Sequence, residues 1–272
     1  MMNLQGVFIE TNDVHRLNSD STRVFILCAG SSQRWNNYLG IPKQLASIGG
    51  ESLLWRTVRI LHAFNLHNIY VVTNNRLLTS ELCIEFTPKL YRYTCETLLS
   101  TDGLWGVKNL ILLGDVYYSY KTMHSIVTSK KDICFFGRPH GSAYTKCKHG
   151  ELFAISFMQS KRDVIINSAR ATINLAKSNL ATGNLWNLYD IIMGFPIMSQ
   201  RVNRILFHRI NDITDDVDTP SDYHNLDKIV NRINSHNAIT VIIAYVAILY
   251  RGIIVRCRVI NKELYSLFLR KY

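Results

Sequence analysis

The sequence predicts an α/β domain in which helices flank a mostly parallel central sheet. The 272-residue chain is 47% hydrophobic and 19% charged, a globular balance that excludes a disordered or collagen-like chain. Four short apolar runs rich in β-branched and aromatic residues are typical of buried strands; they lie at residues 23–27, 69–73, 110–113 and 133–136. A helical pattern separates the first two runs, and strand, helix, strand is the repeating unit of a parallel sheet.

The helices are predicted from apolar residues spaced three and four apart, which places them on one face. The first helix covers residues 52–64, the second residues 162–180, and the third residues 222–233, after Pro220 and Ser221. At this chain length a single large domain is expected. We therefore predict an N-terminal extension at 1–21, the α/β domain at 22–235 and a C-terminal tail at 236–272.

The tail differs in character from the rest of the chain. Residues 238–250 (AITVIIAYVAILY) carry no charge, but this run is shorter than the ~20 apolar residues that a membrane-spanning helix needs. Its β-branched content suits a buried strand or an interfacial segment. We expect an extra strand or helix packed on the domain, in preference to contact with a membrane.

Positive charge is concentrated in the same tail. The chain has 31 Lys+Arg and 20 Asp+Glu, a net charge of +11, which indicates an anionic partner. Residues 236–272 hold six basic residues and one acid, so the remaining 235 residues have a net charge of only +6. No basic stripe with interleaved aromatics is present, and we expect no binding to nucleic acid.

The cellular compartment is predicted from the cysteines and the first 20 residues. The six cysteines form no CxxC pair, and the first 20 residues are mixed and polar, without the apolar core of a secretion signal. We expect reduced thiols and a cytoplasmic location.

A loop of small residues follows the first predicted strand. Neither the GxxxxGK[ST] nor the GxGxxG phosphate-binding pattern occurs there. Small side chains leave backbone N–H groups open to phosphate oxygens, and Arg34 and Lys43 add positive charge. The predicted nucleotide-binding residues of this loop are Ala29, Gly30, Ser31 and Ser32.

Two acidic segments are candidates for a metal site. Asp115 directly follows an apolar strand and Gly114, which places its carboxylate at the carboxyl edge of the sheet, where ligands of open α/β sheets bind. Asp218 precedes Thr219 and Pro220. Carboxylates suit Mg²⁺, but a Gly-Asp pair is also common in turns, and Thr219 and Pro220 are also the residues that begin a helix.

These motifs together resemble a known family. Ala29-Gly30-x-Ser32-x-Arg34, followed by Pro42-Lys43-Gln44-Leu45, is similar to the AGxGxR and PKxL signature of nucleotidyltransferases. That family includes the sugar-phosphate, molybdopterin and methylerythritol-phosphate nucleotidyltransferases, and its Rossmann-like fold is glycosyltransferase-A-like. Ser32 stands where the second Gly is usual, and Trp35 where Met or Leu is usual.

The resemblance implies the roles of the site residues. The loop and Gln44 would surround a nucleoside triphosphate, and Arg34 and Lys43 would be catalytic, offsetting charge on the α-phosphate and the departing pyrophosphate. Asp115 and Asp218 would share Mg²⁺, with Asp216 a weaker candidate. The partners would be a nucleoside triphosphate and a phosphorylated small-molecule acceptor.

A finer resemblance concerns residues 94–101 and 150–157. They are similar to a capsule- and phage-associated branch, which includes cytidylyltransferases acting on phosphorylated glutamine. This resemblance implies CTP as the nucleotide, a role in capsule or related surface-polysaccharide biosynthesis, and contacts of Ser100 and Thr101 with the ribose or base.

Other functions fit the residues less well. A nucleotide-sugar-dependent glycosyltransferase of the same fold usually has an Asp-x-Asp motif after the central strand, whereas here Val116 and Tyr117 follow Asp115. A non-catalytic nucleotide-binding protein is a further alternative, with the unusual tail as its supporting feature. His140, Cys147 and His149 lie close in sequence but lack a fourth zinc ligand, so we expect a polar loop there.

Overall fold

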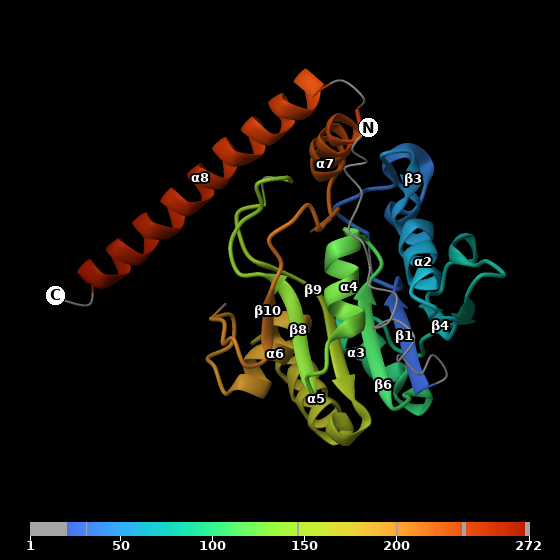
Figure 1. The fold of residues 1–272 in the computed structure, drawn as a ribbon. Coiled ribbons are helices and arrows are strands. Elements are labelled where there is room, and N and C mark those ends of the chain that lie inside the picture. The colour runs from blue at the N-terminus through green and yellow to red at the C-terminus, as the bar shows by residue number, and fades with distance from the viewer. Residues whose placement is uncertain (1–20, 31, 146, 200, 236–237, 270–272) are drawn as a thin grey trace.

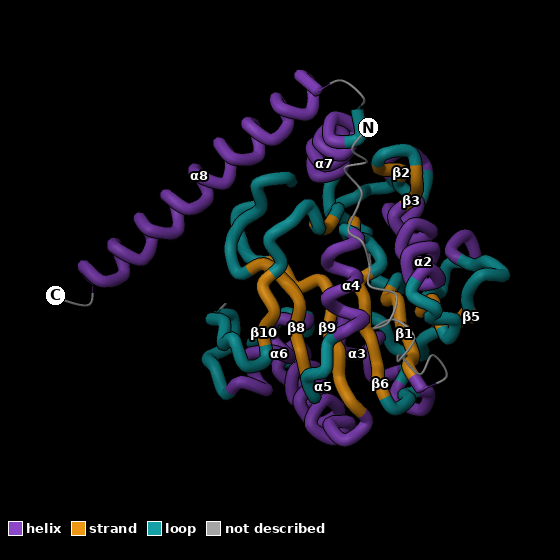
Figure 2. The backbone as a smooth tube through the Cα atoms, viewed as in Figure 1, coloured by secondary structure: helices purple, strands orange, loops and turns teal. Residues whose placement is uncertain are grey.

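The computed structural model describes residues 21–30, 32–145, 147–199, 201–235 and 238–269. Within these residues the central sheet has seven strands. Figures 1 and 2 show the sheet with helices on both of its faces. The strand order is β10-β8-β9-β6-β1-β4-β5. The strands are β1 (Thr22–Leu27), β4 (Ile69–Val72), β5 (Ile84–Phe86), β6 (Lys108–Leu113), β8 (Ile133–Arg138), β9 (Glu151–Met158) and β10 (Phe207–Arg209).

Most of these strands are parallel, which confirms the predicted fold class. β1 pairs in parallel with β4 and β6, β4 with β5, and β10 with β8. β9 is the exception, because it lies antiparallel between β6 and β8. Its first residue therefore lies at the same edge of the sheet as the last residues of the parallel strands.

Alternate residues of β1 enter two separate hydrophobic cores, as the two-residue period of a strand requires. Val24 and Ile26 pack with α2 (Leu53–Ala63) and α4 (Tyr120–Thr128) on one face. Phe25 and Leu27 pack on the other face with α3 (Thr94–Ser100), α5 (Arg162–Lys177) and α6 (Leu185–Met193). The helices predicted at 52–64 and 162–180 are confirmed within a few residues.

A third apolar cluster lies above the carboxyl edge of the sheet. Trp35 from the loop after β1 packs there with Tyr117, Val217 and Leu226. Two short ladders lie in the same region: β2 (Ser47–Ile48) with β3 (Glu51–Ser52), and β7 (Val116–Tyr117) with β11 (Asp215–Asp216). The helix α7 (Pro220–Ile233) follows β11 and confirms the helix predicted at 222–233.

The C-terminal tail forms a helix, one of the two alternatives expected for it, and this helix contacts the domain over a small part of its surface. Ala238–Leu269 forms one helix, α8, which runs away from the sheet in Figure 1. Of the two alternatives, the helix is the one that satisfies its backbone hydrogen bonds without a partner strand. In the stretch 239–257 only Ala244 is buried.

A buried ion pair fixes the segment between β10 and α7 to the sheet. Asp215 is fully buried and accepts hydrogen bonds from Arg138, at the end of β8, and from the hydroxyls of Ser142 and Thr145. Arg138 also donates to the carbonyl of Thr214, at 3.3 Å. Burial raises the pKa of Asp215, while Arg138 and the two hydroxyls oppose that rise.

We predict that replacing Asp215 by alanine destabilises the protein by about 3–5 kcal/mol, because it leaves the Arg138 guanidinium buried without its partner charge. Urea unfolding followed by circular dichroism measures this free energy. Arg59→Ala is the control, since Arg59 pairs with Glu51 while 62% exposed and such pairs contribute about 1 kcal/mol or less. Equal effects of the two variants would contradict the prediction.

Candidate active site

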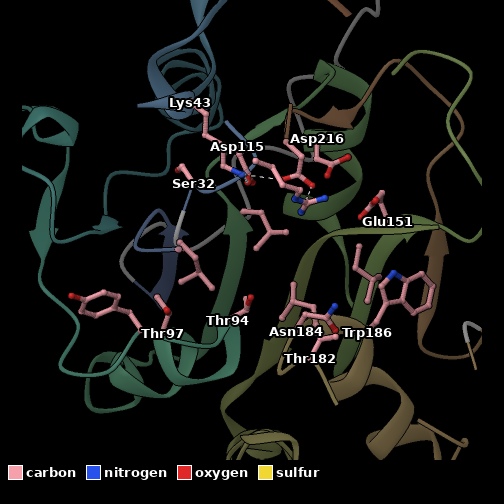
Figure 3. Close-up of a pocket in the computed structure, with 18 of the residues that line it drawn as sticks. Ser32, Lys43, Thr94, Thr97, Asp115, Glu151, Thr182, Asn184, Trp186 and Asp216 are labelled. Carbon is pink, nitrogen blue, oxygen red and sulfur yellow. Dashed lines mark hydrogen bonds and ion pairs between the residues drawn. The ribbon is translucent and has the colours of Figure 1, made fainter. Parts of the chain in front are cut away.

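A cavity of about 410 Å³ opens at the carboxyl edge of the sheet. Leu27 at the end of β1 and Leu113 at the end of β6 form part of its floor. Figure 3 shows Lys43, Asp115 and Ser32 on one side of it and Glu151 and Trp186 on the other, with Asp216 next to Asp115. Ligands of open α/β sheets bind at this edge, and the volume is in the range of small-molecule sites.

The small-residue loop lines the cavity through Gly30 and Ser32. A Cβ added to Gly30 would meet no atom within 4 Å, and the φ angle of Gly30 is not left-handed. Neither packing nor backbone conformation therefore requires glycine at position 30, and the missing side chain leaves open space in the cavity. Ala29 is buried, and Ser31 lies outside the described residues.

The end of the loop is held by Trp35. Its ring is 1% exposed, and its indole N–H donates to the carbonyl of Ile41 at 2.8 Å. Asn36 and Asn37 adopt left-handed backbone conformations, which asparagine tolerates better than most residues. This turn brings Pro42 and Lys43 back to the edge of the sheet.

Lys43 is the charged centre of the site. Its ammonium nitrogen lies 2.9 Å from Asp218 Oδ1 and also contacts the carboxylate of Asp115. Burial acts to lower the pKa of Lys43, but the two carboxylates raise it above its ordinary value. Arg34, which is 67% exposed, reaches Asp218 Oδ2 at 2.5 Å. The structure thus brings together the four charged residues that the sequence predicts.

Backbone pairing places Asp115 and Asp218 side by side. Asp115 lies between β6 and β7, and Asp218 follows β11, the partner of β7. The N–H of Val217 donates to the carbonyl of Asp115 at 2.9 Å. Gly114 is required here by packing, because a Cβ would lie 2.2 Å from Cys28 Sγ.

Asp218 directly precedes a helix cap, which confirms the interpretation of Thr219 and Pro220 as the residues that begin a helix. The Thr219 hydroxyl accepts from the N–H of Asp222, and the Asp222 carboxylate accepts from the N–H of Thr219. Pro220 occupies the first turn of α7. The cap fixes the backbone beside Asp218 while leaving its carboxylate free to face Lys43.

The carboxylates of Asp115 and Asp218 suit a divalent cation. They converge on one ammonium group, so their oxygens already surround the position of a positive charge. Lys43 and Arg34 lower the pKa of Asp218 despite its burial, which favours the ionised form. Hard, ionised oxygen donors are the ligands that Mg²⁺ prefers.

Two predicted nucleotide contacts lie away from the cavity. Thr101 is fully buried, donates to the carbonyl of Leu98 and accepts from the indole N–H of Trp105. The hydroxyl of Ser100 donates to the carbonyl of Thr97. Both residues lie at the C-terminal end of α3, whereas its N-terminal part faces the cavity through Thr94 and Thr97. This placement corrects the expectation for Ser100 and Thr101, whereas Gln44 does line the cavity.

Residues that the sequence analysis did not assign form the opposite wall. They are Thr182, Asn184 and Trp186 near the start of α6, Tyr91, Arg92, Thr94 and Thr97 around α3, and Glu151. Glu151 reaches the wall because β9 is antiparallel, so that its first residue lies at the carboxyl edge. A glutamate at the start of an otherwise apolar strand was the available signal.

Two further acidic residues line the cavity: Glu151 on this wall and Asp216 next to Asp115. Burial raises the pKa of Glu151 to about 7, with the charges of Asp218 and Asp215 adding to the rise. Burial and neighbouring carboxylates, Glu151 first among them, raise the pKa of Asp216 well above its ordinary value. Glu151 also lies close to Cys147 and His149, whose ligand atoms are within 4.8 Å of its carboxylate and of each other.

Comparison with known proteins supports the resemblance stated above. Residues 24–100 match the model of the MobA-like NTP transferase domain, a segment that contains the loop, Arg34 and Lys43. No curated protein gives a significant match to the chain. Asp115 and Asp218 lie beyond the matched segment, so their place in the site comes from the structure.

Two solved structures share the fold. A putative glucose-1-phosphate thymidylyltransferase from Bacillus anthracis has a TM-score of 0.53 at 13% identity, covering 79% of this chain and 98% of its own. The CTP:phosphocholine cytidylyltransferase from Streptococcus pneumoniae has a TM-score of 0.53 at 12% identity, covering 77% and 99%. The likeness to nucleotidyltransferases predicted from the motifs is thereby confirmed.

We predict that Glu151→Gln makes stability less sensitive to pH. The folded state holds the Glu151 proton more tightly than the unfolded chain, so the acid form stabilises the fold below pH 4.5, and this contribution is lost as the pH rises through about 7. Gln cannot ionise and avoids the loss. The variant should therefore gain on the order of 2 kcal/mol over the wild type between pH 5 and pH 8.

Urea unfolding of both proteins at a series of pH values measures this difference. Glu81→Gln is a matched control, because Glu81 lies exposed in a turn, and its stability should follow that of the wild type. A constant difference between Glu151→Gln and the wild type at all pH values would contradict the raised pKa.

Proposed function

We propose that this protein transfers a nucleoside monophosphate from a nucleoside triphosphate to a phosphorylated small molecule, with release of pyrophosphate. The observation that carries the proposal is the contact of one buried lysine, Lys43, with both Asp115 and Asp218 beside a loop of small residues. In a site of this kind the basic groups offset the negative charge of a triphosphate, and the carboxylates hold the cation that accompanies it.

The proposed reaction is an in-line displacement at the α-phosphorus. A phosphate oxygen of the acceptor forms a bond to the α-phosphorus. At the same time the bond between the α-phosphorus and the oxygen that bridges it to the β-phosphorus breaks, and pyrophosphate leaves with the electron pair. Positioning and charge stabilisation carry such reactions. Arg34 and Lys43 would stabilise the charge that develops on the leaving group. No general base is needed, because the acceptor phosphate is already ionised.

Asp115 and Asp218 would hold Mg²⁺, which when bound supplies positive charge next to the α-phosphate. Lys43 contacts the same two carboxylates and holds them next to the small-residue loop, which lines the same cavity. Asp216 lies next to them on β11, where its backbone pairs with that of Val116 on β7.

The opposite wall favours an acceptor with a positive charge in addition to its phosphate. Glu151 and Trp186 both line the cavity there, and an aromatic ring together with a carboxylate stabilises an ammonium group. A phosphorylated amine or amino acid has this chemistry. It agrees with the resemblance of residues 94–101 and 150–157 to cytidylyltransferases of phosphorylated glutamine, which also favours CTP and a role in surface-polysaccharide biosynthesis. The cysteines without CxxC pairs favour a cytoplasmic location.

Pyrophosphate release tests the proposal directly. With Mg²⁺ and each of the four nucleoside triphosphates, we expect release only with a phosphorylated acceptor, fastest with CTP, and faster with phosphorylated amines than with neutral sugar phosphates. Lys43→Ala and Asp115→Ala should each lower the rate by about 10²–10³-fold, the usual cost of removing a group that stabilises transition-state charge.

Arg59→Ala is the control for the activity assay, because Arg59 is a surface cation paired with Glu51 outside the cavity. Its rate should equal that of the wild type. Absence of release with every acceptor and nucleotide would overturn the proposed function, and faster release with neutral sugar phosphates would overturn the proposed acceptor class.

We predict that Gly30→Ala lowers affinity for the nucleoside triphosphate at least about tenfold without changing stability. The added methyl group meets no protein atom, but it occupies space needed for close approach of the phosphates to the backbone. Isothermal titration with a non-hydrolysable analogue measures the affinity. Gly103→Ala is the control, since its methyl group also meets no atom and Gly103 does not line the cavity. Unchanged affinity in Gly30→Ala would contradict this role.

A further inference from the structure

The helix α8 presents a large apolar surface to the solvent. Residues Ile239–Cys257 form a stretch that is long and apolar enough to cross a membrane. The mean hydropathy of this stretch is 1.9, and 6% of it is buried. The exposed large side chains are Ile239, Ile242, Ile243, Tyr245, Val246, Leu249, Tyr250 and Ile253. Monomeric soluble proteins rarely expose a contiguous apolar surface of this kind.

These side chains gather on the outer face of the helix. Ile239, Ile242, Val246, Leu249 and Ile253 are spaced three and four residues apart, which aligns them along one side. The opposite side faces the domain: Ala244 is 1% exposed, and Arg251 Nη1 lies 3.5 Å from the carbonyl oxygen of Tyr144. The helix therefore has an inner face against the domain and an apolar outer face.

The charge of the tail identifies what covers the outer face. Arg251 and Arg256 are the charged residues of the stretch 239–257, and the sequence continues with further basic residues, so that 236–272 holds six basic residues and one acid. Two copies of such a helix repel each other, whereas an anionic surface attracts both. An apolar face flanked by arginines is the pattern of a helix that binds an anionic lipid surface.

We propose that α8 binds in the plane of an anionic lipid bilayer, with its outer face in the boundary between headgroups and acyl chains. Its 19-residue apolar stretch spans about 28 Å, so length alone also allows crossing. A crossing helix, however, would draw the backbone of Tyr144 and the side chain of Arg251 toward the hydrocarbon, where unsatisfied polar groups and charges are costly. The in-plane arrangement keeps both contacts of the inner face.

Vesicle flotation of the full chain tests this proposal. With phosphatidylcholine vesicles that contain phosphatidylglycerol, the protein should float, and without phosphatidylglycerol it should float much less. Leu249→Asp should lower binding by more than about tenfold, because it places a charge at the acyl boundary. Ile205→Asp is the matched control: Ile205 is 71% exposed and Leu249 66% exposed, but Ile205 lies in the domain before β10, and its variant should float like the wild type.

Two further measurements define the mode of binding. Arg256→Ala should weaken binding to anionic vesicles about fivefold, since one basic residue near such a surface contributes about 1 kcal/mol. Cys257 is the exposed cysteine among the described residues, and its labelling by maleimide should slow when vesicles are added. Alkaline carbonate should release the bound protein.

Three results would overturn the proposal. Flotation of Leu249→Asp equal to that of the wild type would show that the outer face is not the binding surface. A lipid-independent dimer that Leu249→Asp breaks, without flotation of the wild type, would assign the face to a second copy. Resistance of the bound wild type to carbonate would show a crossing helix in place of an in-plane one.

Discussion

One buried ammonium group organises the carboxyl edge of the sheet. Lys43 contacts Asp115 from the β6–β7 connection and Asp218 from the segment before α7, and it belongs itself to the loop after β1. Three segments far apart in the sequence therefore meet on one charge. Because burial penalises an unpaired charge by several kcal/mol, each of the three partners constrains the other two, and the cavity forms where they meet.

The backbone supports this arrangement independently of the charges. The short ladder of β7 with β11, the Val217-to-Asp115 hydrogen bond and the buried pair of Arg138 with Asp215 all hold the segment 213–218 against the sheet. These supports carry no reacting group, yet they decide how far apart the two metal-binding candidates lie. Such constraints position the side chains of the site before a ligand binds, as the proposed displacement at a phosphorus atom would require.

The apolar residues of the tail stretch 239–257 are mostly exposed, unlike those of the domain strands. Within the domain, alternate residues of the strands pack against apolar residues on the two faces of the sheet. In α8, by contrast, Ala244 is the only buried residue of the stretch 239–257. The whole tail, residues 236–272, holds six basic residues and one acid, a net charge of +5 out of +11 for the whole chain. Apolar surface and positive charge together are the basis for the proposed contact of α8 with lipid, and Arg251 of this helix lies 3.5 Å from the carbonyl oxygen of Tyr144 in the domain.

The sequence by itself determined four of the seven strands of the sheet and the three helices α2, α5 and α7, because each depends on local periodicity. It also determined the loop of small residues and the candidate residues Arg34, Lys43, Asp115 and Asp218, because these belong to short motifs. Tertiary structure alone decided the rest. The antiparallel placement of β9 brought Glu151 to the cavity, and the direction of α3 turned Thr94 and Thr97 toward it and Ser100 and Thr101 away. Residues 238–250 form a helix and add no strand to the sheet, a choice that the local sequence pattern left open because an apolar run of this length fits either element.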